Sequence, residues 1–240
     1  MEIRGKRKIR VIDDPAADAA EKLGVPCRIR KIRTVPGAVA PFCTTGQLEH
    51  ADGRTYLRHC GPVAVTNALL ALARREDVTV GASPEEIFRT VTEIGRRRGI
   101  YWNMNLFRIF GGTNDLRAGE YLRTCFRTFG LAAGVRFCQP LSGDDLLHPV
   151  RKEHLLYLEL WHHPLYGSHH LICCGACETV SIAARQKVRR KQYLAVADGW
   201  SENMRYLDLS EIGRCRFFEI CPENDRQHGE RRNAAEDSGV

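Results

Sequence analysis

One cysteine at the head of an apolar helical run constrains this chain more than any other feature. Residues 58–73 read Arg-His-Cys-Gly-Pro and then an apolar series, in which apolar residues recur at helical spacing. Pro62 is compatible with the first turn, where its missing N–H would have no partner in any case. The positive end of a helix dipole favours a thiolate, so Cys60 is a candidate nucleophile. The competing interpretation is a buried structural cysteine, because cysteine is often fully buried.

Length and composition favour an ordinary folded domain. The chain has 240 residues, of which 43% are apolar, enough for a sizeable core without metal or disulfides. The first residues are polar and carry no secretory apolar segment, and no stretch approaches the 18 apolar residues that span a membrane. We therefore expect a soluble, cytoplasmic protein without a membrane partner, and we expect its ten cysteines to be reduced thiols.

The charge distribution is basic, with a net charge of +7. Basic side chains concentrate in residues 4–10, 28–33, 96–98 and 187–191. Such clusters can bind nucleic acid, but no recognised nucleic-acid motif accompanies them. Two of the clusters alternate with isoleucines, which is typical of half-exposed strands. We interpret the clusters as solvated faces and expect no nucleic-acid partner.

The first half of the chain is predicted to be mainly helical. Short strands at 8–12 and 25–35 flank a helix over 15–23, and residues 36–52 form a loop. The cysteine helix ends near Arg75, and a capping box at Ser83 begins a helix that ends at Gly99. A loop rich in aromatic and amide side chains follows at 101–105, and a third helix covers 114–129.

The second half changes to strand patterns. Strands are predicted at 135–139, 155–161, 168–175, 192–197 and 216–220, with a short helix over 144–152 and a polar hairpin excursion at 178–191. We divide the chain into an N-terminal extension (1–40), a main domain (41–222) and a disordered tail (223–240). The predicted fold class is α+β, with a helical lobe that carries Cys60 packed on an antiparallel sheet.

The strand half offers a base and an acid for the cysteine. Ser168-His169-His170 begins an apolar strand, and the strand over 192–197 ends in Asp198-Gly199-Trp200. Each feature has a structural alternative. Asp-Gly is a common turn pair, and either histidine could be a half-buried strand residue.

In order and spacing, these motifs resemble the papain-like cysteine peptidase superfamily. The resemblance is closest to the bacteriocin-processing (double-glycine leader) peptidases of bacteria, and it covers about residues 47–220. The resemblance rests on Cys60-Gly61-Pro62, on a histidine six residues before Gly175, and on Asp198 at a strand end. The resemblance implies a papain-like fold and a thiol protease that acts on a peptide or protein without a cofactor or a metal.

The resemblance also implies a catalytic triad of Cys60, His169 and Asp198. His169 would accept the thiol proton, and Asp198 would hold the imidazole in the correct tautomer. We favour His169 over His170 because of the spacing to Gly175. Strand alternation makes that choice consequential, since His169 shares a face with Leu171 while His170 lies on the opposite face.

The oxyanion-binding side chain departs from the family pattern. Relatives often carry a glutamine about six residues before the cysteine, where this chain has Arg54. The nearest upstream amide is Gln47, thirteen residues before Cys60, and we assign it as the second donor beside the Cys60 backbone N–H.

Three alternatives stay open. The same triad could transfer the acyl group to an amine, as in transglutaminases or arylamine acetyltransferases. The missing glutamine keeps open a catalytically inactive papain-like domain that binds peptides. Cys174-Gly175-Ala176-Cys177, with histidines nearby, could instead belong to a structural zinc site or a zinc-stabilised nucleic-acid-binding module.

Overall fold

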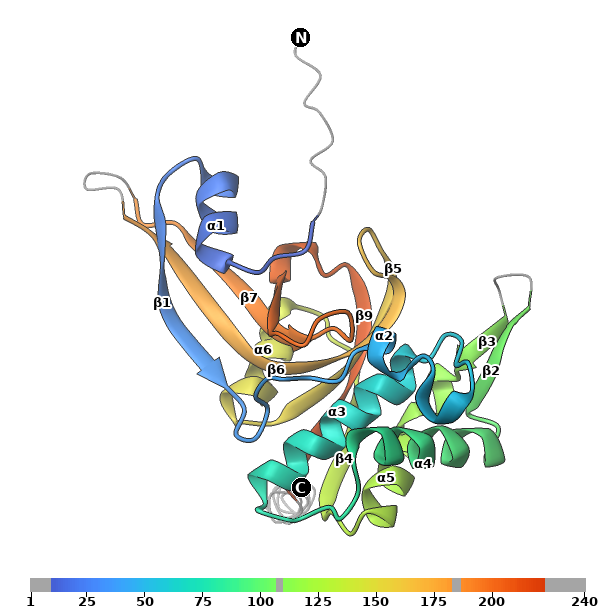
Figure 1. The fold of residues 1–240 in the computed structure, drawn as a ribbon. Coiled ribbons are helices and arrows are strands. Elements are labelled where there is room, and N and C mark those ends of the chain that lie inside the picture. Colours follow the sequence, from blue (N-terminus) through green and yellow to red (C-terminus); the bar gives the residue numbers. More distant parts are fainter. Residues whose placement is uncertain (1–9, 107–109, 183–186, 223–240) are drawn as a thin grey trace, which may run out of the picture.

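The computed structural model of the chain describes residues 10–106, 110–182 and 187–222 (Figure 1). It combines helices with a mainly antiparallel sheet, which confirms the predicted α+β class. The helices are α1 (Pro15–Leu23), α2 (Thr45–Leu48), α3 (Cys60–Arg75), α4 (Pro84–Arg97), α5 (Ala118–Thr128) and α6 (Gly143–Arg151), with 3-10 turns η1 (Ala51–Gly53), η2 (Asp115–Arg117) and η3 (Leu209–Glu211).

A seven-stranded antiparallel sheet forms the centre of the molecule. Its strand order is β4-β9-β5-β6-β7-β8, and β1 pairs with the second half of β6. The strands are β1 (Cys27–Thr34), β4 (Ala133–Cys138), β5 (Leu155–His163), β6 (Gly167–Ser181), β7 (Arg190–Ala197), β8 (Arg205–Asp208) and β9 (Arg214–Pro222). The central strand β5 is almost entirely buried, as its continuous apolar sequence requires.

Helices cover both faces of the sheet. On one face the largest core cluster joins α3, α4 and α5 to alternate residues of the strands, among them Tyr157, Ile172 and Phe218. On the other face α6 packs on the intervening residues, such as Leu158 and Leu171. Figure 1 shows α3 running along the sheet with α4 and α5 beside it. The face that α3 covers decides which strand residues can reach the start of that helix.

The predicted helix boundaries are confirmed where capping chemistry defines them. Ser83 caps α4 through its backbone and side-chain bonds to Glu86, and Gly24 ends α1 in the left-handed conformation with φ of 68°. Helix α3 spans Cys60–Arg75 as expected from its apolar periodicity. Its first residue is therefore the candidate nucleophile.

Other expectations differ from the structure. The predicted loop at 101–105 is a strand, β2 (Tyr101–Leu106), which forms a two-stranded sheet with β3 (Phe110–Thr113). The periodicity of 101–105 is too short to identify a strand without its partner. Strands β6 and β7 extend into the predicted excursion at 178–191, the loop over 36–52 contains α2, and β8 was not predicted. Of the predicted strand at 8–12, residues 8 and 9 lie outside the described chain, and Ile12 forms a single bridge with Tyr206.

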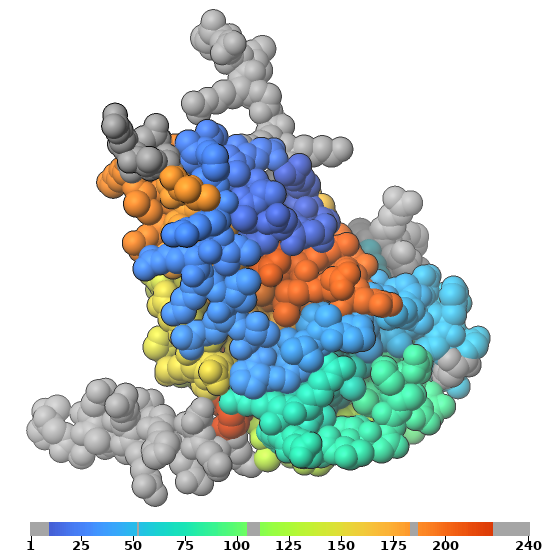
Figure 2. All heavy atoms as spheres, turned by 60° about the vertical axis from the view of Figure 1, so that its left-hand side comes forward, coloured from blue at the N-terminus to red at the C-terminus, as the bar shows by residue number. Residues whose placement is uncertain are grey.

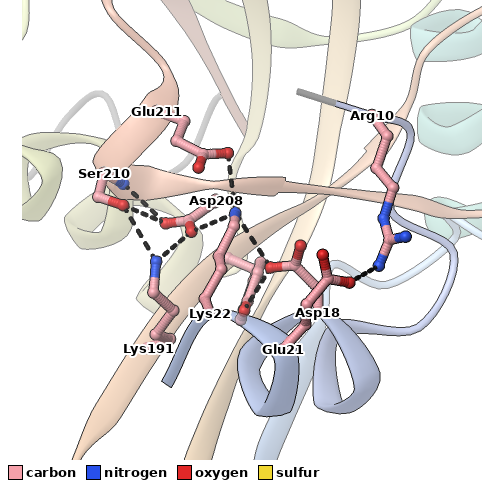
Figure 3. A network of polar contacts seen from close by, with 9 residues as sticks. Arg10, Asp18, Glu21, Lys22, Lys191, Asp208, Ser210 and Glu211 are labelled. Carbon is pink, nitrogen blue, oxygen red and sulfur yellow. Dashed lines mark hydrogen bonds and ion pairs between the residues drawn. The ribbon is translucent and has the colours of Figure 1, made fainter. Parts of the chain in front are cut away.

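The N-terminal segment packs closely on the strands of the main sheet. Its strand β1 lies along β6, and Figure 2 shows these blue residues beside the orange C-terminal strands and above the green helices. Lys22 of α1 joins the N-terminal segment to β8 and η3 through ion pairs. Its ammonium lies 3.1 Å from Asp18, 2.7 Å from Asp208 and 2.8 Å from Glu211, and only 9% of its side chain is exposed (Figure 3).

The remaining expectations concern the chain ends, a membrane span and the basic clusters. The disordered tail predicted for 223–240 lies outside the described residues, as do residues 1–9. Within the described ranges, no helix has the length and apolar character to cross a lipid bilayer. The strand β1, with its cluster of basic residues, is largely exposed, consistent with a solvated basic face.

Candidate active site

Cys60 lies at the first position of α3, where the chain turns sharply into the helix. Arg58, two residues earlier, has a positive φ of 49°, which is uncommon for a residue with a side chain. Gly61 packs so closely on β3 that a Cβ there would lie 2.1 Å from Thr113 Oγ1. The half-buried cysteine thus sits at the positive end of a sixteen-residue helix, on a turn fixed by the β2–β3 hairpin.

Both His169 and His170 act on the cysteine sulfur. The His170 contact has the geometry of a direct hydrogen bond, with Nδ1 3.3 Å from Cys60 Sγ. His170 is on the face of β6 that also presents Ile172 and Cys174, and this is the face that α3 covers. The ring packs beside Tyr157 of β5, with centroids 5.6 Å apart.

Asp115 holds the other side of the His170 ring. Asp115 Oδ1 lies 2.9 Å from His170 Nε2, and its second oxygen accepts a 3.0 Å hydrogen bond from Trp161 Nε1. Because a carboxylate accepts, Nε2 carries the hydrogen and Nδ1 is left to take a proton from the thiol. Cys60, His170 and Asp115 therefore form a continuous nucleophile–base–acid series.

The electrostatics favour charge separation between the cysteine and histidine. Burial raises the pKa of the Cys60 thiol, but the charges and hydrogen bonds of His170 and His169 outweigh it and hold the pKa well below its ordinary value. Burial lowers the pKa of His170, whereas Cys60 and Asp115 raise it by a larger amount. The structure thus favours a thiolate–imidazolium pair, the reactive form of a cysteine nucleophile.

The predicted partners His169 and Asp198 take different places. His169 Nε2 lies 2.7 Å from the backbone carbonyl of Asp198, and its ring stacks on Tyr166. The Asp198 carboxylate does not orient an imidazole. It pairs with Arg205 at 2.8 Å, and accepts hydrogen bonds from Tyr166 Oη and the backbone N–H groups of residues 200 and 201.

This arrangement differs from the expected triad in its base and its acid. The assignment of His169 to the Leu171 face and of His170 to the opposite face is confirmed. The helix with Cys60 packs on the His170 face, and residue spacing could not reveal that. His169 still contributes to the site, because it acts with His170 to lower the pKa of Cys60.

Gln47, expected as an oxyanion donor, is engaged elsewhere. Its side-chain oxygen accepts a 3.0 Å hydrogen bond from the Thr44 N–H in the capping box of α2, and its amide nitrogen donates to Glu202. Among the described residues, the Gln47 side chain makes no hydrogen bond to Cys60. The backbone N–H groups at the start of α3 are the donors that remain beside the sulfur.

A second carboxyl and an arginine lie behind the histidine. Glu159 is opposite His170 in the β5–β6 pairing and opposite Arg216 in the β5–β9 pairing. Arg216 donates to one Glu159 oxygen, lies 4.0 Å from Asp115, and stacks over the Trp161 ring at 4.8 Å. The site therefore contains a buried array of alternating charges rather than an isolated triad.

Ligand atoms of Asp115, Glu159 and His170 lie within 4.8 Å of one another and could in principle hold a metal ion. The surrounding chemistry does not fit one. The Arg216 guanidinium already occupies one Glu159 oxygen, and a second cation beside it would be repelled. Among the described residues this is the only such group, so Cys174 and Cys177 do not form a zinc site; they pack in separate core clusters.

Sequence reasoning missed Asp115 and Glu159 for different reasons. Asp115 opens a predicted helix, where an acidic residue is ordinary dipole chemistry, so it carried no distinct signal. Glu159 did carry one, since it is the single charge in the apolar run Leu155–Trp161. A carboxylate inside a buried strand needs a partner, and that need would have pointed to Glu159.

No protein-family model matches this chain, and no curated protein sequence matches it.

Proposed function

We propose that this protein is a thiol hydrolase that cleaves peptide or amide bonds, with Cys60 as the nucleophile and His170 as the base. The observation that carries the proposal is the 3.3 Å contact between Cys60 Sγ and His170 Nδ1, completed by Asp115 on Nε2. We take His170 and Asp115 in place of the predicted His169 and Asp198, because only the former pair gives a series of side-chain contacts from the sulfur to a carboxylate. It keeps the reaction class that the sequence motifs implied.

The chemistry follows from the positions of the three groups. The Cys60 thiolate attacks the carbonyl carbon, and a tetrahedral oxyanion forms beside the N–H groups at the start of α3. His170 then donates its proton to the departing amine as the C–N bond breaks, leaving a thioester on Cys60. Water, deprotonated by His170, hydrolyses the thioester and restores the thiol. Asp115 stabilises the imidazolium throughout.

The resemblance to papain-like peptidases supports this proposal in part. A helix headed by the nucleophile packs on an antiparallel sheet that carries the histidine, as that family would have it. The acid departs from the family order, because Asp115 comes from the helical half rather than from the strand after the histidine. We propose a papain-like arrangement with a relocated acid.

The proposal predicts a trappable acyl-enzyme. The purified protein is incubated with a mixed peptide library, the amines released are measured, and intact-mass spectrometry detects an acyl group on Cys60. Cys60→Ala and His170→Ala are expected to abolish both signals, whereas Cys27→Ala serves as a matched control at a half-buried cysteine of β1, opposite Ser181 at the far end of β6. Failure of the wild-type protein to release amines or accumulate a thioester would contradict the proposal.

A further inference from the structure

Glu159 is the most unusual charged residue near the site. Its side chain is 1% exposed, and it lies in the middle of the central strand β5. One carboxyl oxygen pairs with Arg216, while the other, Oε1, is buried without a hydrogen-bond partner among the described residues. A buried carboxyl with an unsatisfied oxygen is costly, so its position calls for a compensating role.

The groups around Glu159 belong to the proposed triad or touch it. His170 faces it from β6, Arg216 from β9 and Asp115 from η2, while Tyr157 and Trp161 flank it on its own strand. Two carboxyls and one imidazole thus meet within 4.8 Å, with a single guanidinium beside them. Arg216 offsets one of the two negative charges when both carboxyls are ionised.

We propose that Glu159 is a positioning residue of the site, a second carboxyl that acts with Asp115 to hold His170 in its imidazolium form. Proton transfer from Cys60 to His170 moves positive charge toward Glu159, so an ionised Glu159 favours the charge-separated pair. Arg216 keeps the Glu159 carboxylate in place beside the ring. This inference rests on the proposed function, because it assigns Glu159 a role in the same thiolate–imidazolium pair.

The ionisation state of Glu159 determines the pH range in which it stabilises the His170 imidazolium. Burial raises the pKa of Glu159 to about 7, although His170 and Arg216 act in the opposite direction. Above that pH the carboxylate adds negative charge beside His170, and the imidazolium then persists to higher pH. Below it Glu159 is neutral, and Asp115 alone supports the ring.

The chain provides a matched control for this role. Glu219 of β9 is also buried, also pairs with an arginine (Arg136), and also contacts a histidine, since its Oε1 lies 2.6 Å from His154 Nδ1. That cluster includes none of Cys60, His170 and Asp115. Glu159→Gln and Glu219→Gln therefore remove the same kind of charge, and only the first of them touches the triad.

The test is an NMR titration of the full chain with 13C-labelled histidine, in which His170→Ala and His154→Ala assign the two rings. Glu159→Gln is expected to weaken proton binding to His170 about tenfold, one pH unit in its midpoint, and to leave His154 unchanged. Glu219→Gln is expected to shift His154 alone. An unchanged His170 midpoint in Glu159→Gln overturns the inference.

A second measurement needs no variant to fold. In the unmodified protein with 13C-labelled glutamate and histidine, the Glu159 carboxyl carbon and the His170 ring are expected to share a titration step, and a Glu159 signal that does not change through the His170 transition overturns the inference. Peptide cleavage by the wild type tests the proposed function separately. If the protein cleaves no peptide but Glu159 and His170 titrate together, only the hydrolase assignment is wrong. If it cleaves peptides but the two groups titrate independently, only the role of Glu159 is wrong.

Discussion

Asp115 and His170 are 55 positions apart in the sequence, yet Asp115 Oδ1 lies 2.9 Å from His170 Nε2. The contact exists because the β2–β3 hairpin delivers η2 to the end of the sheet where β6 begins. It gives the candidate nucleophile an oriented base. Asp198, the acid that follows the next strand, is occupied by Arg205 and Tyr166.

Removing the charge of each acid should separate their roles. In Asp115→Asn the imidazolium loses its counterion, so we expect alkylation of Cys60 at pH 6 to slow about tenfold with little change in melting temperature. Asp198→Asn removes the fully buried member of the pair with Arg205, which is itself 19% exposed, and should cost about 3 kcal/mol of stability. Alkylation rates and thermal melts measured on both variants check this. A larger loss of Cys60 reactivity in Asp198→Asn than in Asp115→Asn would favour the original assignment.

Gly61 should be intolerant of any side chain. A Cβ at this position would lie 2.1 Å from Thr113 Oγ1, so Gly61→Ala forces apart α3 and β3 and should cost about 2 kcal/mol or more. Removing the obstructing side chain provides the control. In a Thr113→Gly background the same substitution should cost much less, as measured by denaturant unfolding of the four proteins. Equal costs in both backgrounds would show that the clash is not the cause.

The ion network of Lys22 should control acid stability. Lysine neighbours and hydrogen bonds outweigh burial and lower the pKa of Asp208 from 3.8 to about 2. A lowered carboxyl pKa stabilises the fold above pH 3.8, and that contribution, about 2 kcal/mol, is lost as the pH falls through about 2.

Lys22→Met removes the cation that Asp18, Asp208 and Glu211 share. We expect this variant to lose about 3 kcal/mol at pH 7, and to lose less than wild type on further acidification. The exposed Lys31→Met on β1 is the control and should behave as wild type. Urea unfolding at pH 7 and pH 3 measures both effects, and equal stability of the two variants at pH 7 would contradict this account.

The sequence-based predictions succeeded where local chemistry decides structure. Single local patterns identify an element: Pro62 for the start of α3, the capping box at Ser83 for α4, and the apolar runs for β5 and β6. The site depends on which face of the sheet α3 covers, and local sequence does not determine that face. Strand alternation separated His169 from His170, but only the packing of α3 on one face of the sheet selects His170.

The sequence also gives no sign that Asp115 is the acid that contacts His170. Nothing near Asp115 distinguishes it from an ordinary helix-start residue, because its partner is supplied by a strand 55 positions later. The β2–β3 hairpin that positions it lacks a periodic signal of its own. Long-range placement of this kind follows from tertiary packing, which a single sequence does not reveal.

The most direct test of the central claim is the pH dependence of Cys60 alkylation by iodoacetamide, read by peptide mass spectrometry in wild type, His170→Ala and His169→Ala. We expect Cys60 of the wild type to label at a pH well below that of an ordinary thiol, and far faster than the other nine cysteines. His170→Ala should move the midpoint to that of an ordinary thiol, and His169→Ala should move it less. Equal labelling of all ten cysteines, or a larger effect of His169→Ala than of His170→Ala, would contradict the Cys60–His170 assignment.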